Sequence, residues 1–142
     1  MTAMDQLLRL RAADDEDLAV LSVCLQDALV AVGDMDYSAS EHRFVLVANR
    51  FRWEASVEPK APCARILTGI TIEGVTGARR WRIDPRKRDQ ILALLTLRAV
   101  PEGIELTFAG GRAIRLDVEE IKVRLQDFGE DWPAVARPCH DK

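Results

Sequence analysis

Apolar and polar residues alternate along residues 103–118, the most regular stretch of this chain. The apolar residues recur at every second position: Ile104, Leu106 and Phe108, then Ile114, Leu116 and Val118. A period of two is typical of strands that bury one face. Gly110-Gly111 separates the two runs, and glycine adopts the positive φ angles that a tight hairpin turn requires. The pattern predicts two strands joined by a glycine hairpin.

The apolar spacing changes after Asp117. The following apolar positions are three, four and three residues apart: Val118, Ile121, Leu125 and Phe128. This spacing places them on one face of a helix. Asp117 suits the N-cap of that helix, Glu120 completes a capping box, and Gly129 suits the position after its end. We therefore expect a capped C-terminal helix that closes the core.

The rest of the chain predicts one further helix and several strands. An acid-rich start followed by an apolar face predicts a helix at 14–25. Strands are expected at 27–36, with a kink at Gly33-Asp34, and at 43–54 after a polar hairpin loop at 38–42. A loop with two prolines precedes a strand at 65–75, with which a short strand at 79–83 is expected to pair. The apolar run 91–97 predicts a buried strand.

This order predicts an α+β fold. We expect a bent, mostly antiparallel sheet or small barrel, with an N-terminal helix and the capping C-terminal helix. A barrel of the pleckstrin-homology type, closed by its last helix, fits the order by analogy. At 142 residues the chain is expected to form a single domain over 1–142, with 1–12 and 130–142 as candidate mobile termini.

Several short segments occur in an order that resembles a known family. They are Leu25-Gln26-Asp27-Ala28, Val32-Gly33-Asp34-Met35, Asn49-Arg50-Phe51 with Trp53-Glu54, Phe108-Ala109-Gly110-Gly111, 113–119 and Arg137-Pro138-Cys139-His140. Over nearly its whole length the chain resembles the alphaproteobacterial domain of unknown function 2948 family. The resemblance implies a short cytoplasmic bacterial protein with no assigned activity and no catalytic residues to transfer. The segment 77–88 is more basic here than the resemblance leads us to expect.

Composition excludes few function classes. The net charge of −3 predicts no polyanion partner for the protein as a whole. No apolar run approaches the ~20 residues of a membrane span, and the first residues do not resemble a secretory signal, so a cytoplasmic location is expected. The three cysteines show no zinc-binding spacing, and we interpret His42 in a hairpin loop and His140 in the tail, where Cys139 is only its neighbour, as solvated side chains rather than bases or ligands. We expect no metal and no cofactor.

The clearest departure from this neutral background is a basic run. Residues 79–88 contain six cations and one acid, so the segment carries +5 and the remainder −8. Its candidate anion-binding residues are Arg79, Arg80, Trp81, Arg82, Arg86, Lys87 and Arg88. The run would bind nucleic acid if Trp81 stacked on a base while the cations contacted phosphates. The alternative is a solvated strand edge on which charge prevents aggregation, with Trp81 packed on the sheet.

A second candidate ligand- or partner-binding cluster lies on neighbouring predicted strands. Its members are polar or charged: Asp34, Asn49, Arg50, Arg52 and Glu54. We interpret Arg50 and Asp34 as a cross-strand ion pair or as part of a polar binding face. The sequence favours a non-enzymatic binding module with a protein partner. The alternatives are a nucleic-acid or polyanion binder through residues 79–88, and a metal-independent enzyme that uses Asp34, Arg50 and Glu54.

Overall fold

The computed structural model describes residues 7–51 and 64–133, which form ten strands, one α-helix and one 3-10 helix. The elements are β1 (Arg9–Ala12), α1 (Asp15–Cys24), β2 (Leu29–Ala31), a 3-10 helix (Val32–Asp34), β3 (Met35–Ser38), β4 (Arg43–Phe51), β5 (Ala64–Glu73), β6 (Gly77–Trp81), β7 (Ile91–Val100), β8 (Gly103–Phe108), β9 (Arg112–Asp117) and β10 (Val123–Pro133).

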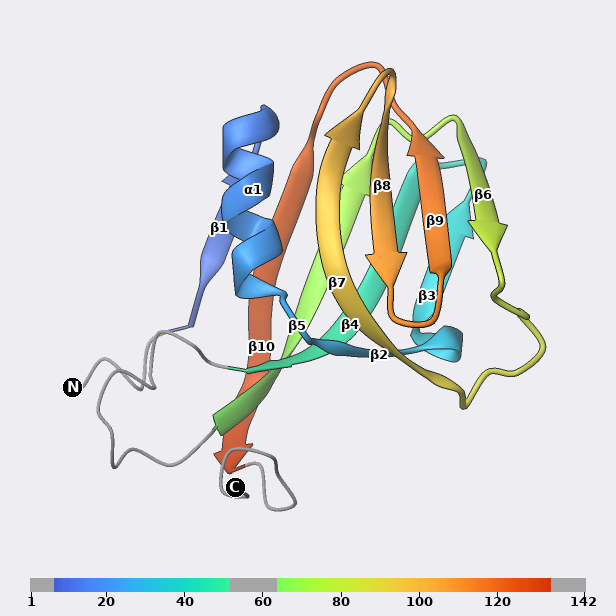
Figure 1. Ribbon diagram of the computed structural model, residues 1–142. Helices are drawn as coiled ribbons and strands as arrows, with labels where there is room; N and C mark the ends of the chain where they lie inside the picture. The colour runs from blue at the N-terminus through green and yellow to red at the C-terminus, as the bar shows by residue number, and fades with distance from the viewer. Residues whose placement is uncertain (1–6, 52–63, 134–142) are drawn as a thin grey trace.

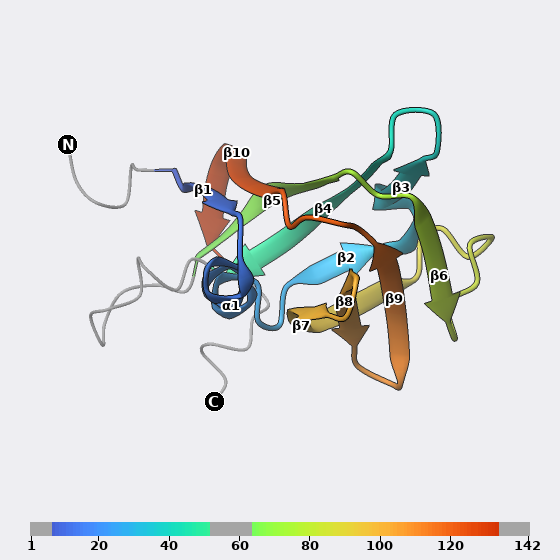
Figure 2. The same ribbon diagram turned by 90° about the horizontal axis from the view of Figure 1, so that it is seen from above.

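The strands form a single antiparallel sheet that folds back on itself. Its order is β1-β10-β5-β4-β2-β7-β8-β9-β6, and β3 pairs with β4 beside β2. Figures 1 and 2 show one layer of β1, β10, β5 and β4 facing another of β7, β8, β9 and β6. The mostly antiparallel sheet is confirmed. The sheet is not closed, however, so the expectation of a closed pleckstrin-homology-like barrel is wrong for the described residues.

Helix α1 covers the side of the two layers where β1 and β7 lie, with which it makes most of its contacts. Asp14 is its N-cap and accepts a hydrogen bond from the Asp17 amide at 2.8 Å, while Asp17 accepts one from the Ala13 amide at 3.0 Å. The side chains of Leu18 and Leu21 on the inner face of α1 are buried. The helix predicted at 14–25 is confirmed, and two of its acidic residues cap its first turn.

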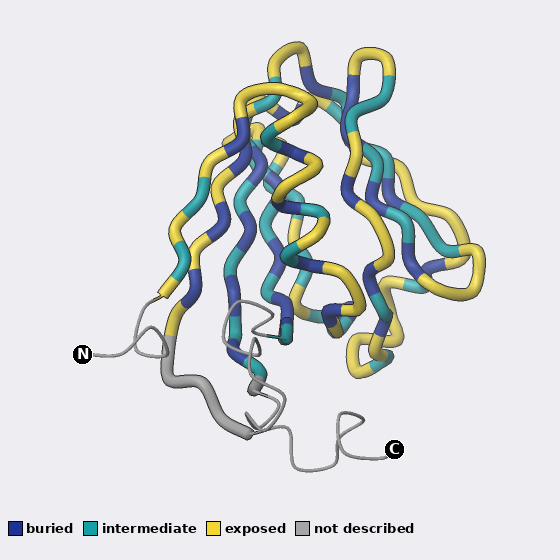
Figure 3. The backbone as a smooth tube through the Cα atoms, turned by 60° about the vertical axis from the view of Figure 1, so that its left-hand side comes forward, coloured by how far each residue is buried: buried dark blue, intermediate teal, exposed yellow. Residues whose placement is uncertain are grey.

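The core lies between the two layers and follows the alternation read from the sequence. Figure 3 shows buried and exposed positions alternating along the strands. On β5 the predicted inward face is buried, from Ile66 to Ile72. On β8 and β9 the inward residues are Ile104, Leu106, Phe108, Ile114 and Leu116. The hairpin between β8 and β9 is confirmed, and Gly110 and Gly111 have φ angles of 85° and 73°.

The predicted C-terminal helix is wrong. Asp117 is the last residue of β9 and caps no helix, and position 129 lies within strand β10. β10 is hydrogen-bonded to β1 on one edge and to β5 on the other. The predicted helix face contained Val118 and Leu125, which are buried here as well, but also Phe128, which is 39% exposed. Strand pairing on both edges satisfies backbone groups that a helix would satisfy internally.

Two smaller expectations also need correction. The strand predicted at 27–36 is divided into β2 and β3 by the 3-10 helix, at the position where a kink was expected. The short strand predicted at 79–83 is present as β6, but its partner is β9 and not the preceding strand β5. β6 therefore ends the sheet, and only β9 pairs with it among the described residues.

A candidate anion-binding hollow beside strand β6

The chain changes direction directly after β6. Arg82 has a φ of 61°, in the left-handed region that residues other than glycine seldom occupy. The turn buries the next residue, Ile83, which is 8% exposed. Asp84 then holds the loop, because its carboxylate accepts from the Arg86 amide at 3.0 Å and its carbonyl accepts from the Lys87 amide at 3.1 Å. A strained, tightly held turn thus fixes this part of the basic run.

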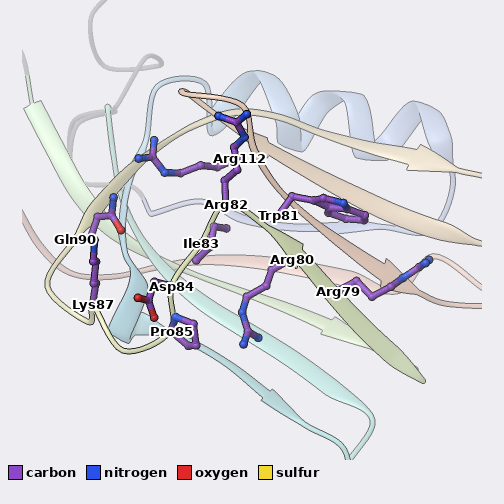
Figure 4. A pocket seen from close by; sticks show the side chains of 10 residues that line it. All are labelled: Arg79, Arg80, Trp81, Arg82, Ile83, Asp84, Pro85, Lys87, Gln90 and Arg112. Atoms are coloured by element: carbon purple, nitrogen blue, oxygen red, sulfur yellow. The ribbon is translucent and has the colours of Figure 1, made fainter.

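The turn and β6 border a surface hollow of about 800 Å³, which Figure 4 shows from close by. We call it the basic hollow, and it is lined by Arg79, Arg80, Trp81, Arg82, Ile83, Asp84, Pro85, Lys87, Gln90 and Arg112. Arg112 comes from β9, and its guanidinium donates to the Ala109 carbonyl at 3.0 Å. The fold therefore places Arg112 beside the basic run 79–88, although the sequence pattern did not predict this.

Most cations of the basic hollow form no ion pair with an acidic side chain in the described residues 7–51 and 64–133. Arg86, next to the hollow, pairs with Asp84 at 3.1 Å, and Arg79 is 3.7 Å from the carboxylate of Asp117. Within the described part of the chain no ion pair involves the three remaining cations of the run that line the hollow: Arg80, Arg82 and Lys87. The Arg86 hydrogen bonds, aided by the charges of Lys87 and Arg80, hold the pKa of Asp84 below its usual value.

Trp81 is 46% exposed and lies among these cations. On β6 it is paired with Ala113 of β9, while Arg80 is paired with the buried Ile114. Residues paired directly across an antiparallel ladder project to the same face. Trp81 and Arg79 therefore belong to the outer face of the sheet and Arg80 to the inner face. The indole is accessible from solvent, as a stacking interaction would require.

The second predicted cluster is separated by the fold. Arg50 is fully buried and forms an ion pair with Asp127 at 2.7 Å, so its carboxylate partner is not Asp34 as expected. The Arg50 Nε donates to Asp127 at 3.0 Å and to Thr68 at 3.1 Å, and the Thr68 hydroxyl donates to Asp127 at 2.6 Å. The Leu8 amide also donates to Asp127. These contacts join β4, β5 and β10 inside the core.

The other members of that cluster lie elsewhere. Asn49 is on β4, where its carbonyl and side chain accept from Arg65 at 2.9 and 3.4 Å. The guanidinium of Arg65 stacks 3.8 Å from the centre of the Phe51 ring. Asp34 ends the 3-10 helix and is exposed, and Arg52 and Glu54 lie outside the described residues. Asn49 is half-buried and Asp34 is exposed, so neither joins the buried ion pair.

Sequence reasoning missed the ion pair between Arg50 and Asp127, although part of the signal was present. Arg50 has the same parity along β4 as Phe44, Leu46 and Ala48, which are all buried. A strict period of two would have placed Arg50 in the core. Asp127 gave no such signal, because its segment was assigned to a helix.

Fold and hollow together define a class: an open, curled antiparallel sheet with one covering helix and a cationic hollow at its last strand. The chain belongs to the family described as "Protein of unknown function (DUF2948)", which matches residues 8–140. The resemblance to this family is confirmed. No curated protein and no solved structure matches the chain. Among the described residues no helix is long and apolar enough to cross a membrane, and no three metal-binding side chains are grouped.

Proposed function

We propose that this protein is a non-enzymatic binding module that takes an anionic partner in the basic hollow. The observation that carries the proposal is a set of cations at one end of β6 that form no ion pair with any described residue: Arg80, Arg82 and Lys87. Like charges held together repel one another, and an anionic ligand would relieve that repulsion. The strained backbone at Arg82 adds support, because strained residues gather at functional sites.

Several exposed arginines on other strands have carboxylate partners, such as Arg98 with Glu105 at 2.7 Å and Arg124 with Glu73 at 3.0 Å. Arg9 and Arg11 of β1 are exposed and form no ion pair with a described residue, but the basic hollow differs because three such cations line one hollow. The chain outside residues 79–88 carries a charge of −8, so acids are plentiful. Cations that form no ion pair with the described part of an acidic protein favour recognition of a limited acidic surface, and we therefore propose another protein as the partner.

The alternatives rank lower on this geometry. An enzyme based on Asp34, Arg50 and Glu54 would need a reactive Arg50, whose guanidinium is inside the core in an ion pair. Single-stranded nucleic acid is the stronger alternative, because exposed Trp81 beside cations could stack on a base. A charge of −8 on the rest of the chain would repel a long polyanion. A cytoplasmic location stays part of the proposal.

Fluorescence anisotropy tests the proposal with three labelled probes: a glutamate-rich peptide, single-stranded RNA and single-stranded DNA. Titrations at about 50 and about 200 mM salt would compare the parent with Arg80→Glu/Arg82→Glu. The double variant Arg9→Glu/Lys122→Glu is the matched control, because both of its sites are exposed and its charge changes equally.

We expect at least one probe to bind the parent in a salt-sensitive way. The Arg80→Glu/Arg82→Glu variant should bind it at least about tenfold more weakly, while the control variant keeps most of the affinity. If no probe binds, or if both variants lose affinity equally, the basic hollow is not the binding site.

A further inference from the structure

A smaller, apolar pocket lies next to the basic hollow. It has a volume of about 170 Å³ and lies between β3 and β6. Its apolar walls are Val32, Met35, Phe44, Ile83 and Ile114, and polar groups of Asp36, Tyr37, Arg79 and Arg80 also line it. The two cavities share part of their lining, including Arg79, Arg80 and Ile83. A ligand bound by the cations of the basic hollow can therefore also place an uncharged group in the smaller pocket.

The strands on both sides of this pocket each have an unpaired edge. Within the described part of the chain β6 pairs only with β9, and β3 pairs only with β4. Figures 1 and 2 show β3 and β6 on the same side of the molecule, in the two facing layers. An unpaired edge presents backbone donors and acceptors to which an extended chain can bind as an added strand.

The two faces of β6 differ in what they would offer to such a strand. The inner face carries Ala78 and Arg80, which are paired with the core residues Leu116 and Ile114. The outer face carries Arg79 and Trp81. Successive side chains of an added strand would point alternately to these faces. Acidic side chains would meet the arginines on either face, and one inward apolar side chain could enter the pocket.

From this geometry we infer that the partner is an extended acidic segment of another protein, which adds as a strand to β6 and places one apolar side chain in the pocket between β3 and β6. The inference rests on the proposed function, because it uses the same cations. A cavity of about 150 Å³ lined by apolar side chains can hold a benzene molecule. The pocket is therefore large enough for a side chain such as leucine or phenylalanine.

This occupant fits the apolar pocket better than nucleic acid does. RNA could use the cations and Trp81, but its polar base edges would lose hydrogen bonds against the apolar walls of the pocket. In an acidic peptide with one apolar residue, the acidic side chains would pair with the cations of the basic hollow and the apolar side chain would fill the pocket. The peptide backbone would form hydrogen bonds with the edge of β6. Charge complementarity between the basic run at +5 and an acidic segment supplies the long-range attraction.

Three peptides of nine residues separate these contributions. The first alternates glutamate with threonine and has leucine at its centre, the second replaces that leucine with serine, and the third is the first with methylated backbone amides. Their affinities for the parent are measured by fluorescence anisotropy beside those of single-stranded RNA. We expect the leucine peptide to bind most tightly, and the serine and methylated peptides to bind at least about tenfold more weakly.

A protein variant tests the pocket directly. Ala78 is exposed and lines the pocket, so Ala78→Leu should fill it without disturbing the core or changing the charge. Ala19→Leu, on the exposed side of α1, is the matched control. We expect Ala78→Leu to lower the affinity for the leucine peptide at least about tenfold and to leave the affinity for the serine peptide unchanged. Ala19→Leu should change neither affinity.

Each contrary outcome has a different meaning. If every anionic probe fails to bind, the proposed function itself is wrong. If RNA binds in a salt-sensitive way that Ala78→Leu does not alter, while the peptides fail, the basic hollow is used but the inferred partner is wrong. Equal affinities for the leucine and serine peptides, or for the plain and methylated ones, would also overturn the inference. A dimer in sedimentation that Ala78→Leu dissociates would assign the pocket to a second copy of this chain.

Discussion

Removing the charge of Asp127 should strongly destabilise the protein. The carboxylate accepts four hydrogen bonds, from two nitrogens of Arg50, the Thr68 hydroxyl and the Leu8 amide, at 2.6–3.0 Å. Asp127→Asn keeps the shape of the side chain and removes its negative charge. Arg50, which is fully buried, would then lack its counter-ion inside the core.

The expected magnitude follows from the burial of both partners. Removing one member of a buried ion pair costs about 3–5 kcal/mol, because the remaining charge is left without compensation. A domain of this kind has a total unfolding free energy of about 5–15 kcal/mol, so a large share would be lost. Arg50→Met combined with Asp127→Leu should cost less than Asp127→Asn alone, because no charge then stays buried.

The effect should also depend on pH. Burial alone raises the pKa of Asp127, but hydrogen bonds from Arg50, Thr68 and the Leu8 amide, with the charge of Arg50, hold that pKa below its usual value. A carboxyl whose pKa is lower in the folded state stabilises the protein above its unfolded pKa of about 3.9. The difference between parent and Asp127→Asn should therefore be complete near pH 6 and shrink below about pH 4.

Urea denaturation, monitored by circular dichroism at several pH values, measures both the loss of unfolding free energy and its dependence on pH. Asp36→Asn, at an exposed position on β3, is the matched control and should stay within about 0.5 kcal/mol of the parent. An Asp127→Asn protein within that same margin at neutral pH, with an unchanged dependence on urea, would refute the structural role of the ion pair. Amide hydrogen exchange gives a second readout, because loss of the bond from Leu8 should expose the start of β1.

Two further predictions concern packing and capping. Leu116→Ala and Leu125→Ala should each lower the unfolding free energy by about 2–5 kcal/mol, since both side chains are almost completely buried, and unchanged urea midpoints would contradict this. Asp14→Ala should cost about 0.5–2 kcal/mol because Asp14 caps α1. Asp117→Ala should cost less than about 0.5 kcal/mol, because its ion pairs are exposed and 3.7–3.8 Å long; thermal denaturation that ranked these two the other way would contradict the assignment.

The local parts of this fold could be predicted from the sequence. The helix at 14–25 has its own cap and its own apolar face, and the hairpin between β8 and β9 has its own glycine turn. The inward faces of β5, β8 and β9 follow from alternation, since side chains of a strand point alternately to opposite faces whatever the neighbouring strand. These features depend on residues close together in the sequence.

The segment 118–128 shows where local reasoning fails. Val118 and Leu125 could be buried on the inward face of a helix, or on a strand and the segment that leads into it. Their burial therefore does not distinguish a helix from a strand. The decision depends on β1 and β5, which pair with β10 on both edges and are more than 40 residues away in sequence. Tertiary pairing of this kind overrides a local preference whose total is small.

The two candidate sites differ for the same reason. The sequence alone showed that residues 79–88 are basic and that Arg50 lies near other polar residues along the chain. Only the tertiary structure brought Asp127 to Arg50 across 77 residues, and placed Arg112 beside the basic run. Whether a charge is neutralised or left for a ligand depends on which distant residue lies within a few ångströms, because electrostatic interactions act through space and not along the chain.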